Sequence, residues 1–384
     1  MMLPFGYATR NLMRDPARLL QTVMGSMLVV MLVMSAYALN DGMRKAMRAS
    51  GSEANVMLLG AGSEESVQRS EVTEQAAGIA ETSIRGVYAR RGMRAVSPEI
   101  YHMAYFDFEG DWRGRGMVRG VTERALLTHP GITIIEGRFP GPGEVLAGRM
   151  AWRSFNVSRD AFRIGATVEL EGVALTVSGI MAEPGTVTES EVWMNINQLR
   201  TLAKRESVSA VVVRLADGEP ADVHLFTKER FDLELAAIPE KKYFEKLSAF
   251  YAPIRAMIWI TAALIAVSAI FGGLNTLYAA FAGRVREIAT LQAMGFRPAA
   301  ILLSFVQESM LASLLGTLMG AVICVLLLSG RIAGISAGAF TLSMGPETLY
   351  AGILTGLALG VLGAVPPALR CLKPALPVAL RDSG

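Results

Sequence analysis

Four long apolar segments constrain the fold of this chain more than any other feature of its sequence. They are Leu19–Leu39, Met257–Ala282, Ala299–Leu328 and Leu349–Leu369. A helix rises about 1.5 Å per residue, so a helix formed by the first segment would be long enough to cross a hydrocarbon core about 30 Å thick. Only 18% of the chain is charged, below the roughly 25% of typical soluble domains. The sequence therefore predicts a helical membrane protein with four spans.

A cleaved signal peptide is the alternative interpretation of the first apolar segment. The apolar region of such a peptide usually has about 7–15 residues and ends at a small-residue cleavage site. Leu19–Leu39 is longer, contains no charge and continues directly into the polar residues Asn40–Lys45. We therefore expect it to be retained as a transmembrane helix.

Residues 40–251 contain no further segment that is apolar enough to span, and they predict a mixed α/β domain. The alternating runs Ala166–Leu170 and Val173–Val177, joined by Glu171-Gly172, predict a β-hairpin. Further strands are expected at Asn55–Leu59, Ile100–Phe108, Met117–Val121, Ile132–Ile135 and Val208–Leu215, and helices at about Glu64–Ala80 and Asn197–Arg205. The predicted fold is an α-helical bundle of four spans in a 1+3 arrangement, with this large α/β extracytoplasmic domain between spans 1 and 2.

The distribution of basic residues predicts the orientation in the membrane. The flanking basic residues are Arg10, Arg14 and Arg18; Arg284, Arg286 and Arg297; and Arg370, Lys373 and Arg381. The loop Ser329–Pro346 carries only Arg331, so the positive-inside rule places both termini in the cytoplasm. Arg44, Lys45 and Arg48 oppose this assignment, but long translocated domains are largely exempt from the rule. We expect a multi-pass protein of a bacterial inner membrane with its large domain in the periplasm.

The expected organisation has nine parts. They are a cytoplasmic amphipathic amino terminus (1–18), span 1 (19–39), the α/β domain (40–251), span 2 (257–282), a charged cytoplasmic segment (284–297), span 3 (299–328), a periplasmic loop (329–346), span 4 (349–369) and a cytoplasmic carboxyl terminus (370–384). Two subdomains would fit within 40–251, without a boundary that the sequence can place. A charged helical segment is expected after Pro239, and it leads into span 2. Whether this helix is continuous across Pro253 or is kinked at Pro253 is left open.

Motif searches give no catalytic, cofactor or metal site. The chain lacks a GxxxxGK[ST] phosphate-binding loop, an HExxH motif and paired cysteines, and its three histidines are far apart. The literal GxSxG at Gly334–Gly338 lies in a short loop with no histidine after it, and we interpret it as a chance match. The net charge of +3 does not indicate nucleic-acid binding. A membrane-anchored enzyme with a carboxylate pair in the large domain remains an alternative.

Polar and small residues within the spans predict contacts between helices. Asn275 and Glu308 are polar residues at membrane depth, where hydrogen bonding between helices is the expected use. Gly316 and Gly320, and then Gly352, Gly356 and Gly360, recur at intervals of four residues. This spacing lets helix backbones approach closely in lipid. Whether the packing is within one subunit or between subunits is left open.

The charged segment Arg284–Met294 is only moderately amphipathic. Val285, Ile288, Ala289 and Ala293 are expected to share one face, with Leu291 and Met294 off it. By its pattern alone, this segment is equally well interpreted as a docking helix or as an ordinary loop.

At these residues the chain resembles the FtsX/MacB-type (FtsX-like) ABC transporter permeases. The matching residues are Asn275-Thr276-Leu277, Arg284 with Arg286–Ala289, Leu291–Gly295, Phe305–Glu308, and Gly316 with Gly320, together with the amino-terminal Arg10–Arg18 and the carboxyl-terminal Pro374–Arg381. Ala289 and Gln292 replace the family's usual glycine and arginine. The region Gly137–Met194 resembles the MacB-like periplasmic core domain.

This resemblance implies a non-catalytic permease subunit that binds no cofactor itself. Two copies of a separate ABC ATPase subunit would bind ATP and Mg, and a second permease copy or a sister permease would complete a dimer. The expected contacts with the ATPase, on a coupling helix, are Arg284, Arg286, Glu287, Ile288, Leu291, Ala293, Gly295 and Phe296. Membrane lipid and a periplasmic adaptor of the membrane-fusion type or a substrate-binding protein are further expected partners.

The family also implies a mechanism. Mechanotransmission would couple ATP hydrolysis in the cytoplasm to movement of the periplasmic domain, for export or extraction of a lipid, lipoprotein or hydrophobic compound. The alternative within the family is a signalling or regulatory permease that controls a periplasmic enzyme and transports nothing.

Overall fold

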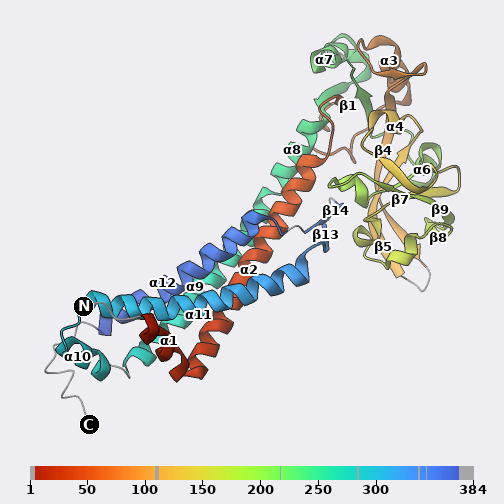
Figure 1. Ribbon diagram of the computed structural model, residues 1–384. Coiled ribbons are helices and arrows are strands. Elements are labelled where there is room, and N and C mark those ends of the chain that lie inside the picture. The colour runs from red at the N-terminus through yellow and green to blue at the C-terminus, as the bar shows by residue number, and fades with distance from the viewer. Residues whose placement is uncertain are drawn as a thin grey trace. The chain divides into compact units, whose positions relative to one another are not determined.

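The chain forms two compact units. The computed structural model describes residues 5–108, 112–216, 218–282, 285–335, 338–342 and 344–371. The first unit comprises the described residues up to Asp41, then Pro253–Arg331 and the described residues from Leu342 onward. The second unit comprises Gly42–Ala252 and Ile332–Thr341 (Figure 1).

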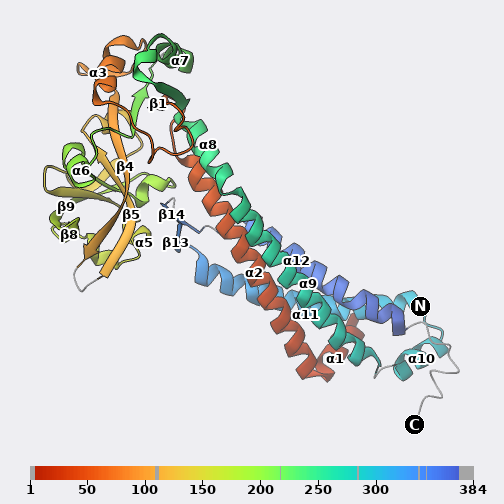
Figure 2. The ribbon, with the colours of Figure 1, turned by 180° about the vertical axis from the view of Figure 1, so that it is seen from behind.

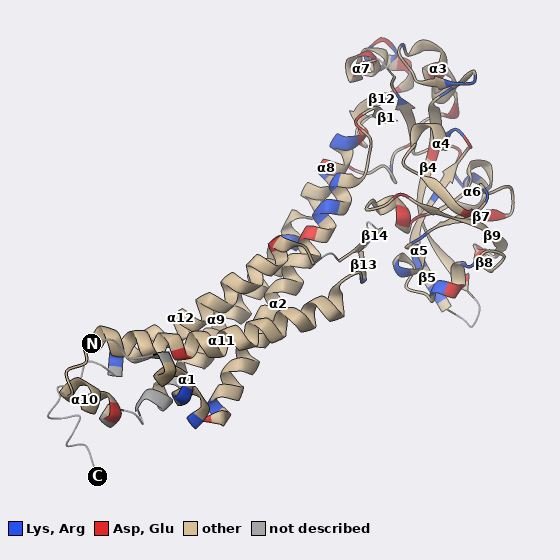
Figure 3. Ribbon diagram, viewed as in Figure 1, with Lys and Arg blue, Asp and Glu red and all other residues tan. Residues whose placement is uncertain are grey.

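Long apolar helices make up most of the first unit. Its helices are α1 (Phe5–Arg14), most of α2 (Pro16–Ala49) and of α9 (Ala252–Ala282), α10 (Val285–Ala293), α11 (Pro298–Leu328) and α12 (Pro346–Cys371). In the described part of the chain, four helical stretches are long and apolar enough to cross a membrane: Pro16–Ala49, Glu240–Asn275, Pro298–Leu328 and Pro346–Arg370. Lys, Arg, Asp and Glu are sparse along α9 and α12 (Figure 3).

Glycine and proline separate the short helix α10 from α11. Gly295 has a φ of +90°, in the left-handed region that glycine adopts after a helix. Pro298 is the first residue of α11, where the missing N–H has no partner to lose. The chain therefore leaves α10 and enters α11 within a few residues.

The second unit is built on one ten-stranded mixed sheet. Its strand order is β12-β1-β11-β4-β5-β10-β7-β9-β6, and β8 pairs with β4 and β9. The strands are β1 (Asn55–Gly60), β4 (Val96–Phe108), β5 (Trp112–Val121), β6 (Thr133–Gly137), β7 (Glu144–Gly148), β8 (Thr167–Leu170), β9 (Val173–Ala182), β10 (Val192–Asn195), β11 (Ala210–Arg214) and β12 (Leu235–Pro239). The long strand β4 joins the two halves of the sheet, because Val96–Glu99 pairs with β11 and Ile100–Phe108 pairs with β5.

Short helices surround this sheet. They are α3 (Glu74–Ser83), α4 (Ala125–Thr128), α5 (Ala151–Ser154), α6 (Ile196–Leu202), α7 (Pro220–Glu229) and α8 (Glu240–Phe250), with the 3₁₀ turns η1 (Arg159–Phe162), η2 (Val187–Ser190) and η3 (Phe231–Leu233). A two-stranded hairpin, β2 (Ala89–Arg90) and β3 (Met93–Arg94), follows α3. Both views place α3 and α7 at one end of the sheet and β8 with β9 at the other (Figures 1 and 2).

All of the expected strands are present, but the helix expected at Glu64–Ala80 is wrong over its first half. The structure has α3 at Glu74–Ser83, whereas residues 61–70 form successive turns. The hydroxyl of Ser70 accepts the backbone N–H of Gly60 at 2.9 Å, and Val72 forms an isolated bridge with Val208. These contacts to distant residues pull the segment out of helix.

The expected hairpin of β8 and β9 is present with the turn its sequence demands. Glu171 and Gly172 both have positive φ, at 50° and 78°, which matches the twist of a two-residue hairpin.

The sequence left open whether helix continues across Pro253. In the structure, α8 ends at Phe250 and α9 begins at Ala252. Pro253 therefore lies in the first turn of α9, where proline interrupts no helical hydrogen bond.

The loop between α11 and α12 forms structure that the sequence did not predict. It contains the antiparallel strands β13 (Ile332–Ile335) and β14 (Gly338–Thr341), which belong to the second unit. Phe340 is buried there, and a Cβ added to Gly42 would lie 2.9 Å from its ring. The expected simple loop is thus a hairpin packed on the large domain.

Candidate functional site

The helix α10 has one buried side and one exposed side. Ile288 and Leu291 are buried in a cluster with Ile301 and Phe305 of α11 and Ala368 of α12. Ala293, Met294 and Gly295 are exposed. The expected face was wrong at two positions, since Leu291 is buried and Ala293 is exposed. The i, i+3 pair Ile288 and Leu291 forms the buried stripe because α11 and α12 lie against it.

Glu287, which the sequence assigned to the ATPase contact, has partners on the amino-terminal helix. The hydroxyl of Tyr7 donates a hydrogen bond of 2.5 Å to its carboxylate, and Nη1 of Arg14 lies 3.8 Å from the same oxygen. Phe296 is half-buried against the cluster formed by Ile288 and Leu291. Arg284 and the side chain of Arg286, expected in the same contact, lie outside the described residues. The helix α10 is therefore held by α1 on one side and by α11 on another.

Glu308 lies at a buried junction of three helices in the first unit. Nδ2 of Asn11 on α1 donates a hydrogen bond of 2.7 Å to Oε2 of Glu308, and the guanidinium of Arg18 on α2 pairs with Oε1. The side chains of Arg18 and Glu308 are 7% and 6% exposed. A buried carboxylate requires such compensation, so the contact ties α1 and α2 to the first half of α11.

The five glycines that the sequence assigned to helix packing all lie against other helices of the same chain. An added Cβ would overlap Ser26 of α2 at Gly316, and would lie 2.8 Å from the carbonyl oxygen of Met27 at Gly320. On α12, it would lie 2.7 Å from Met34 at Gly352, overlap Thr317 at Gly356, and lie 2.7 Å from Ser313 at Gly360. Close approach of α2, α11 and α12 thus depends on these positions. Asn275, which was grouped with them, is exposed on α9 and belongs to none of these contacts.

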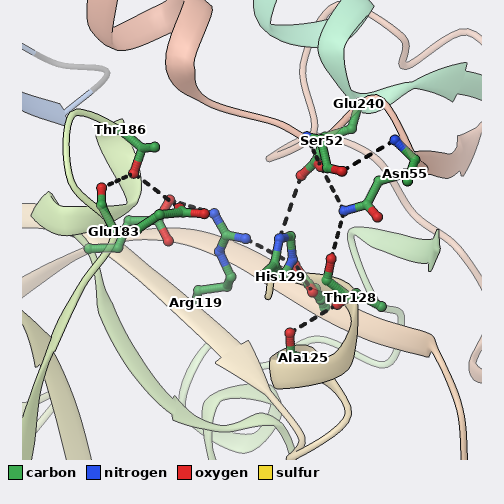
Figure 4. A network of polar contacts seen from close by, with 12 residues as sticks. Ser52, Asn55, Arg119, Ala125, Thr128, His129, Glu183, Thr186 and Glu240 are labelled. Atoms are coloured by element: carbon green, nitrogen blue, oxygen red, sulfur yellow. Dashed lines mark hydrogen bonds and ion pairs between the residues drawn. The ribbon is translucent and has the colours of Figure 1, made fainter. Parts of the chain in front are cut away.

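A cluster of five buried ionisable side chains lies in the second unit (Figure 4). We call Glu99, Arg119, His129, Glu191 and Glu240 the buried ion cluster; each is at most 8% exposed. Glu99 lies on β4, Arg119 lies on β5, and Glu191 directly precedes β10. His129 follows α4, and Glu240 is the first residue of α8.

Arg119 and His129 are the cations of this cluster. Arg119 pairs with Glu99 at 3.2 Å and with Glu191 at 2.6 Å. Nε2 of His129 lies 2.9 Å from Oε1 of Glu99, and Nδ1 lies 3.8 Å from Oε1 of Glu240. Burial of charge is costly, and these pairings offset that cost.

The pKa values of this cluster follow from burial and pairing. Burial alone would raise the pKa of Glu99, but the charge and hydrogen bond of His129, aided by Arg119 and Tyr101, lower it to about 2. Burial alone would lower the pKa of His129, but the charge and hydrogen bond of Glu99, aided by Glu240, raise it to about 9. At neutral pH both groups are therefore charged.

Sequence reasoning missed this cluster. Only His129 was considered, as one of three scattered histidines, and its partners lie at positions from 99 to 240. No motif spacing could have joined them. In the described residues, no group of three or more His, Cys, Asp or Glu side chains is arranged to hold a metal ion.

Each unit contains a cavity. One of about 280 Å³ lies between α2, α9, α11 and α12, and its lining includes Gln21, Ser26 and Ser313 but no charged residue. Another of about 730 Å³ lies in the second unit beside Trp112 and Arg163. Neither is lined by the buried ion cluster.

Comparison with known families assigns both halves of the chain. Residues 19–223 match the MacB-like periplasmic core domain, and residues 259–376 match the FtsX-like permease C-terminal domain. The chain belongs to the FtsX/MacB-type ABC transporter permeases. Permeases of this family are subunits of ABC transporters and work with ATPase partners. The family and the apolar helices together indicate an inner-membrane protein with a periplasmic domain. The second unit is this periplasmic domain.

Solved structures show low similarity to the chain. The periplasmic region of MacB from Actinobacillus actinomycetemcomitans is 11% identical, with a TM-score of 0.39 over 53% of this chain and 97% of that one. The extracellular domain of the noncanonic ABC-type transporter YknZ from Gram-positive bacteria is 14% identical, with a TM-score of 0.37 over 48% of this chain and 99% of that one. No curated protein sequence matched the chain.

Proposed function

We propose that this chain is a non-catalytic permease subunit that works by mechanotransmission. Separate ATPase subunits would dock on α10, and their ATP-driven movement would pass through the spanning helices to the periplasmic domain. The observation that carries this proposal is the anchoring of α10. Its buried side packs on α11 and α12, Glu287 is held by α1, and Ala293 and Met294 remain exposed for a partner.

ATP and Mg would be bound by the partner, because the chain has no phosphate-binding loop of its own. Two ATPase copies and a second permease, either the same chain or a sister, would complete the complex. Both termini and α10 would face the cytoplasm, as their basic residues favour.

The cargo would be a lipid, a lipoprotein or another hydrophobic compound taken from the membrane or the periplasm. The cavity between the four spanning helices supports this class, because none of the residues that line it is charged. Its volume of about 280 Å³ is just below that of pockets that hold drug-sized ligands, which start at about 300 Å³. Such a cavity does not favour conduction of a polar solute through the spans.

Substitution of Met294, an exposed residue in the turn directly after α10, tests the docking. Met294 is 60% exposed, and Met294→Glu should place a charge in the ATPase interface without disturbing the packed side of the helix. We expect loss of the ATPase from affinity purifications of the intact permease. Met93→Glu is the matched control, since Met93 is 49% exposed on the periplasmic domain and should retain the ATPase. Recovery of no ATPase with the wild-type chain would contradict the proposed function itself.

A further inference from the structure

Two connections between helix and sheet lie against each other in the periplasmic domain. One is Ser50–Ala54, which joins α2 to β1, and the other is the step from β12 into α8 at Pro239–Glu240. Strands β1 and β12 are paired, with Val56 opposite Pro239. Gly51 has a φ of +79°, and an added Cβ would lie 2.8 Å from the ring of Phe244 and 3.2 Å from Glu240. Both helices therefore meet the sheet at one edge, at points where a chain can pivot.

The carboxylate of Glu240 holds these two connections together. Its Oε2 accepts the backbone N–H of Ser52 at 2.8 Å and Nδ2 of Asn55 at 2.8 Å. The same Nδ2 donates to the carbonyl oxygen of Thr128 at 2.9 Å. Glu240 is the first residue of α8, where the helix dipole favours a negative charge. One buried carboxylate thus fastens α8 to the segment that follows α2.

His129 connects this carboxylate to the centre of the sheet. Nδ1 of its ring lies 3.8 Å from Oε1 of Glu240 (Figure 4). Nε2 of the ring lies 2.9 Å from Oε1 of Glu99 of β4. The charge of Arg119 on β5 disfavours a charge on His129, but Arg119 is itself paired with Glu99 and Glu191. The rings of His129 and Trp193 pack edge to face, with their centroids 6.0 Å apart. A contact between ionised groups in a buried site is stronger and more directional than one in water.

We propose that Glu240 and His129 are positioning residues that lock the pivots of α2 and α8 against the sheet. Because of this lock, a displacement of either helix reaches the periplasmic domain as movement of one rigid body. Without it, the helices would turn at the two connections, Ser50–Ala54 and Pro239–Glu240, and the sheet would stay behind. The role rests on the proposed function, since it matters only if those helices transmit movement.

Three substitutions separate the contacts of this lock. Glu240→Gln keeps an oxygen for Ser52 and Asn55 and removes the charge that faces His129. His129→Gln removes the cation between Glu240 and Glu99. Glu245→Gln is the matched control, because Glu245 is an exposed carboxylate on the same helix.

Hydrogen–deuterium exchange on the intact complex, in lipid and with its ATPase, provides the measurement. Without nucleotide, we expect exchange at residues 50–55 and 240–244 to rise at least tenfold in Glu240→Gln and His129→Gln, as a lost buried ionic contact predicts. Glu245→Gln should match the wild type. Unchanged exchange at both connections in the two variants would overturn the lock.

A second comparison, with and without a non-hydrolysable ATP analogue, tests transmission. In the wild type we expect nucleotide to change exchange at α10 and across β4 and β5. In Glu240→Gln and His129→Gln the change at α10 should remain and the change at β4 and β5 should disappear. A domain that is merely less stable would exchange faster but would still respond to nucleotide, and that result would overturn the positioning role. If the wild type responds at neither site, mechanotransmission fails and the positioning role fails with it.

Discussion

At the scale of single residues, the periplasmic domain is organised around charges that water does not reach. Glu99 is fully buried and contacts Tyr101 of the same strand, Arg119 of β5 and His129, which follows α4. Removal of one member would leave its partner charged and unpaired, a change that typically costs about 3–5 kcal/mol. The buried ion cluster therefore makes the fold of this domain sensitive to protonation.

The pKa shifts predict how stability depends on pH. The pKa of His129 is raised from 6.5 to about 9, so its contribution is full below pH 6.5 and is lost as the pH rises through 9. The pKa of Glu99 is lowered from 4.5 to about 2, so its contribution is full above pH 4.5 and is lost as the pH falls through 2. Both shifts arise from the same ion pair between His129 and Glu99, so their contributions are not added. This ion pair contributes about 3 kcal/mol to the free energy of unfolding.

Thermal unfolding of the intact chain, followed by tryptophan fluorescence, checks the alkaline limb. Between pH 6.5 and 9.5 we expect the midpoint for the periplasmic domain to fall by about 6–12 °C, from the usual relation for domains of this size. His129→Gln should unfold at a lower temperature at pH 6.5 and lose most of this dependence on pH. The same slope in both proteins would contradict the assignment.

At the scale of elements, local patterns predicted structure well where neighbours in sequence decide it. The hairpin of β8 and β9 follows from alternation and from Glu171-Gly172, all within sixteen residues of the chain. The strands β7 and β10 and the edge strand β12 were not predicted. Each is short, and each is stabilised by partners far away in the sequence, such as β5 beside β10. The error at Glu64–Ala80 has the same origin, because Val72 pairs with Val208 and the carbonyl oxygen of Ser70 accepts a hydrogen bond from the side chain of Arg205.

Glycine substitutions test the packing of the spanning helices. In most helices, alanine is more stable than glycine by about 0.5–1 kcal/mol. At Gly316 an added methyl group would overlap Ser26 of α2, so Gly316→Ala should instead destabilise the protein, by about 1–3 kcal/mol. Gly25→Ala, on α2 with nothing within 4 Å of its Cβ, should be neutral or stabilising. Thermal unfolding in detergent measures the difference, and equal effects at the two sites would refute close packing at Gly316.

At the scale of the whole molecule, three segments of the described residues connect the spanning helices to the periplasmic domain. They are the outer end of α2, the helix α8, and the hairpin of β13 and β14 that links α11 to α12. The hairpin was expected to be a plain loop. Its Ala339 and Phe340 are buried in the periplasmic domain, so α11 and α12 also have an attachment there.

Cysteine labelling tests the orientation of the whole chain. In a version without Cys324 and Cys371, Ala293→Cys on α10 should react with an impermeant maleimide only after the cells are lysed. Glu123→Cys, an exposed position of the periplasmic domain, should react once the outer membrane alone is opened. Both sites are exposed, so access to the reagent and not burial decides the result. Labelling of Ala293→Cys in intact spheroplasts would reverse the proposed topology.

The sequence by itself determined the number and place of the apolar helices, the polar domain between the first two of them, and the resemblance to a family. These depend on hydropathy and on motifs, which add up over neighbouring residues. Only the tertiary structure decided that Glu99, Arg119, His129, Glu191 and Glu240 form one buried cluster, and that residues 332–341 belong to the large domain. Electrostatic pairing depends on distance in space, and strand order brings together charges whose separation along the chain carries no signal.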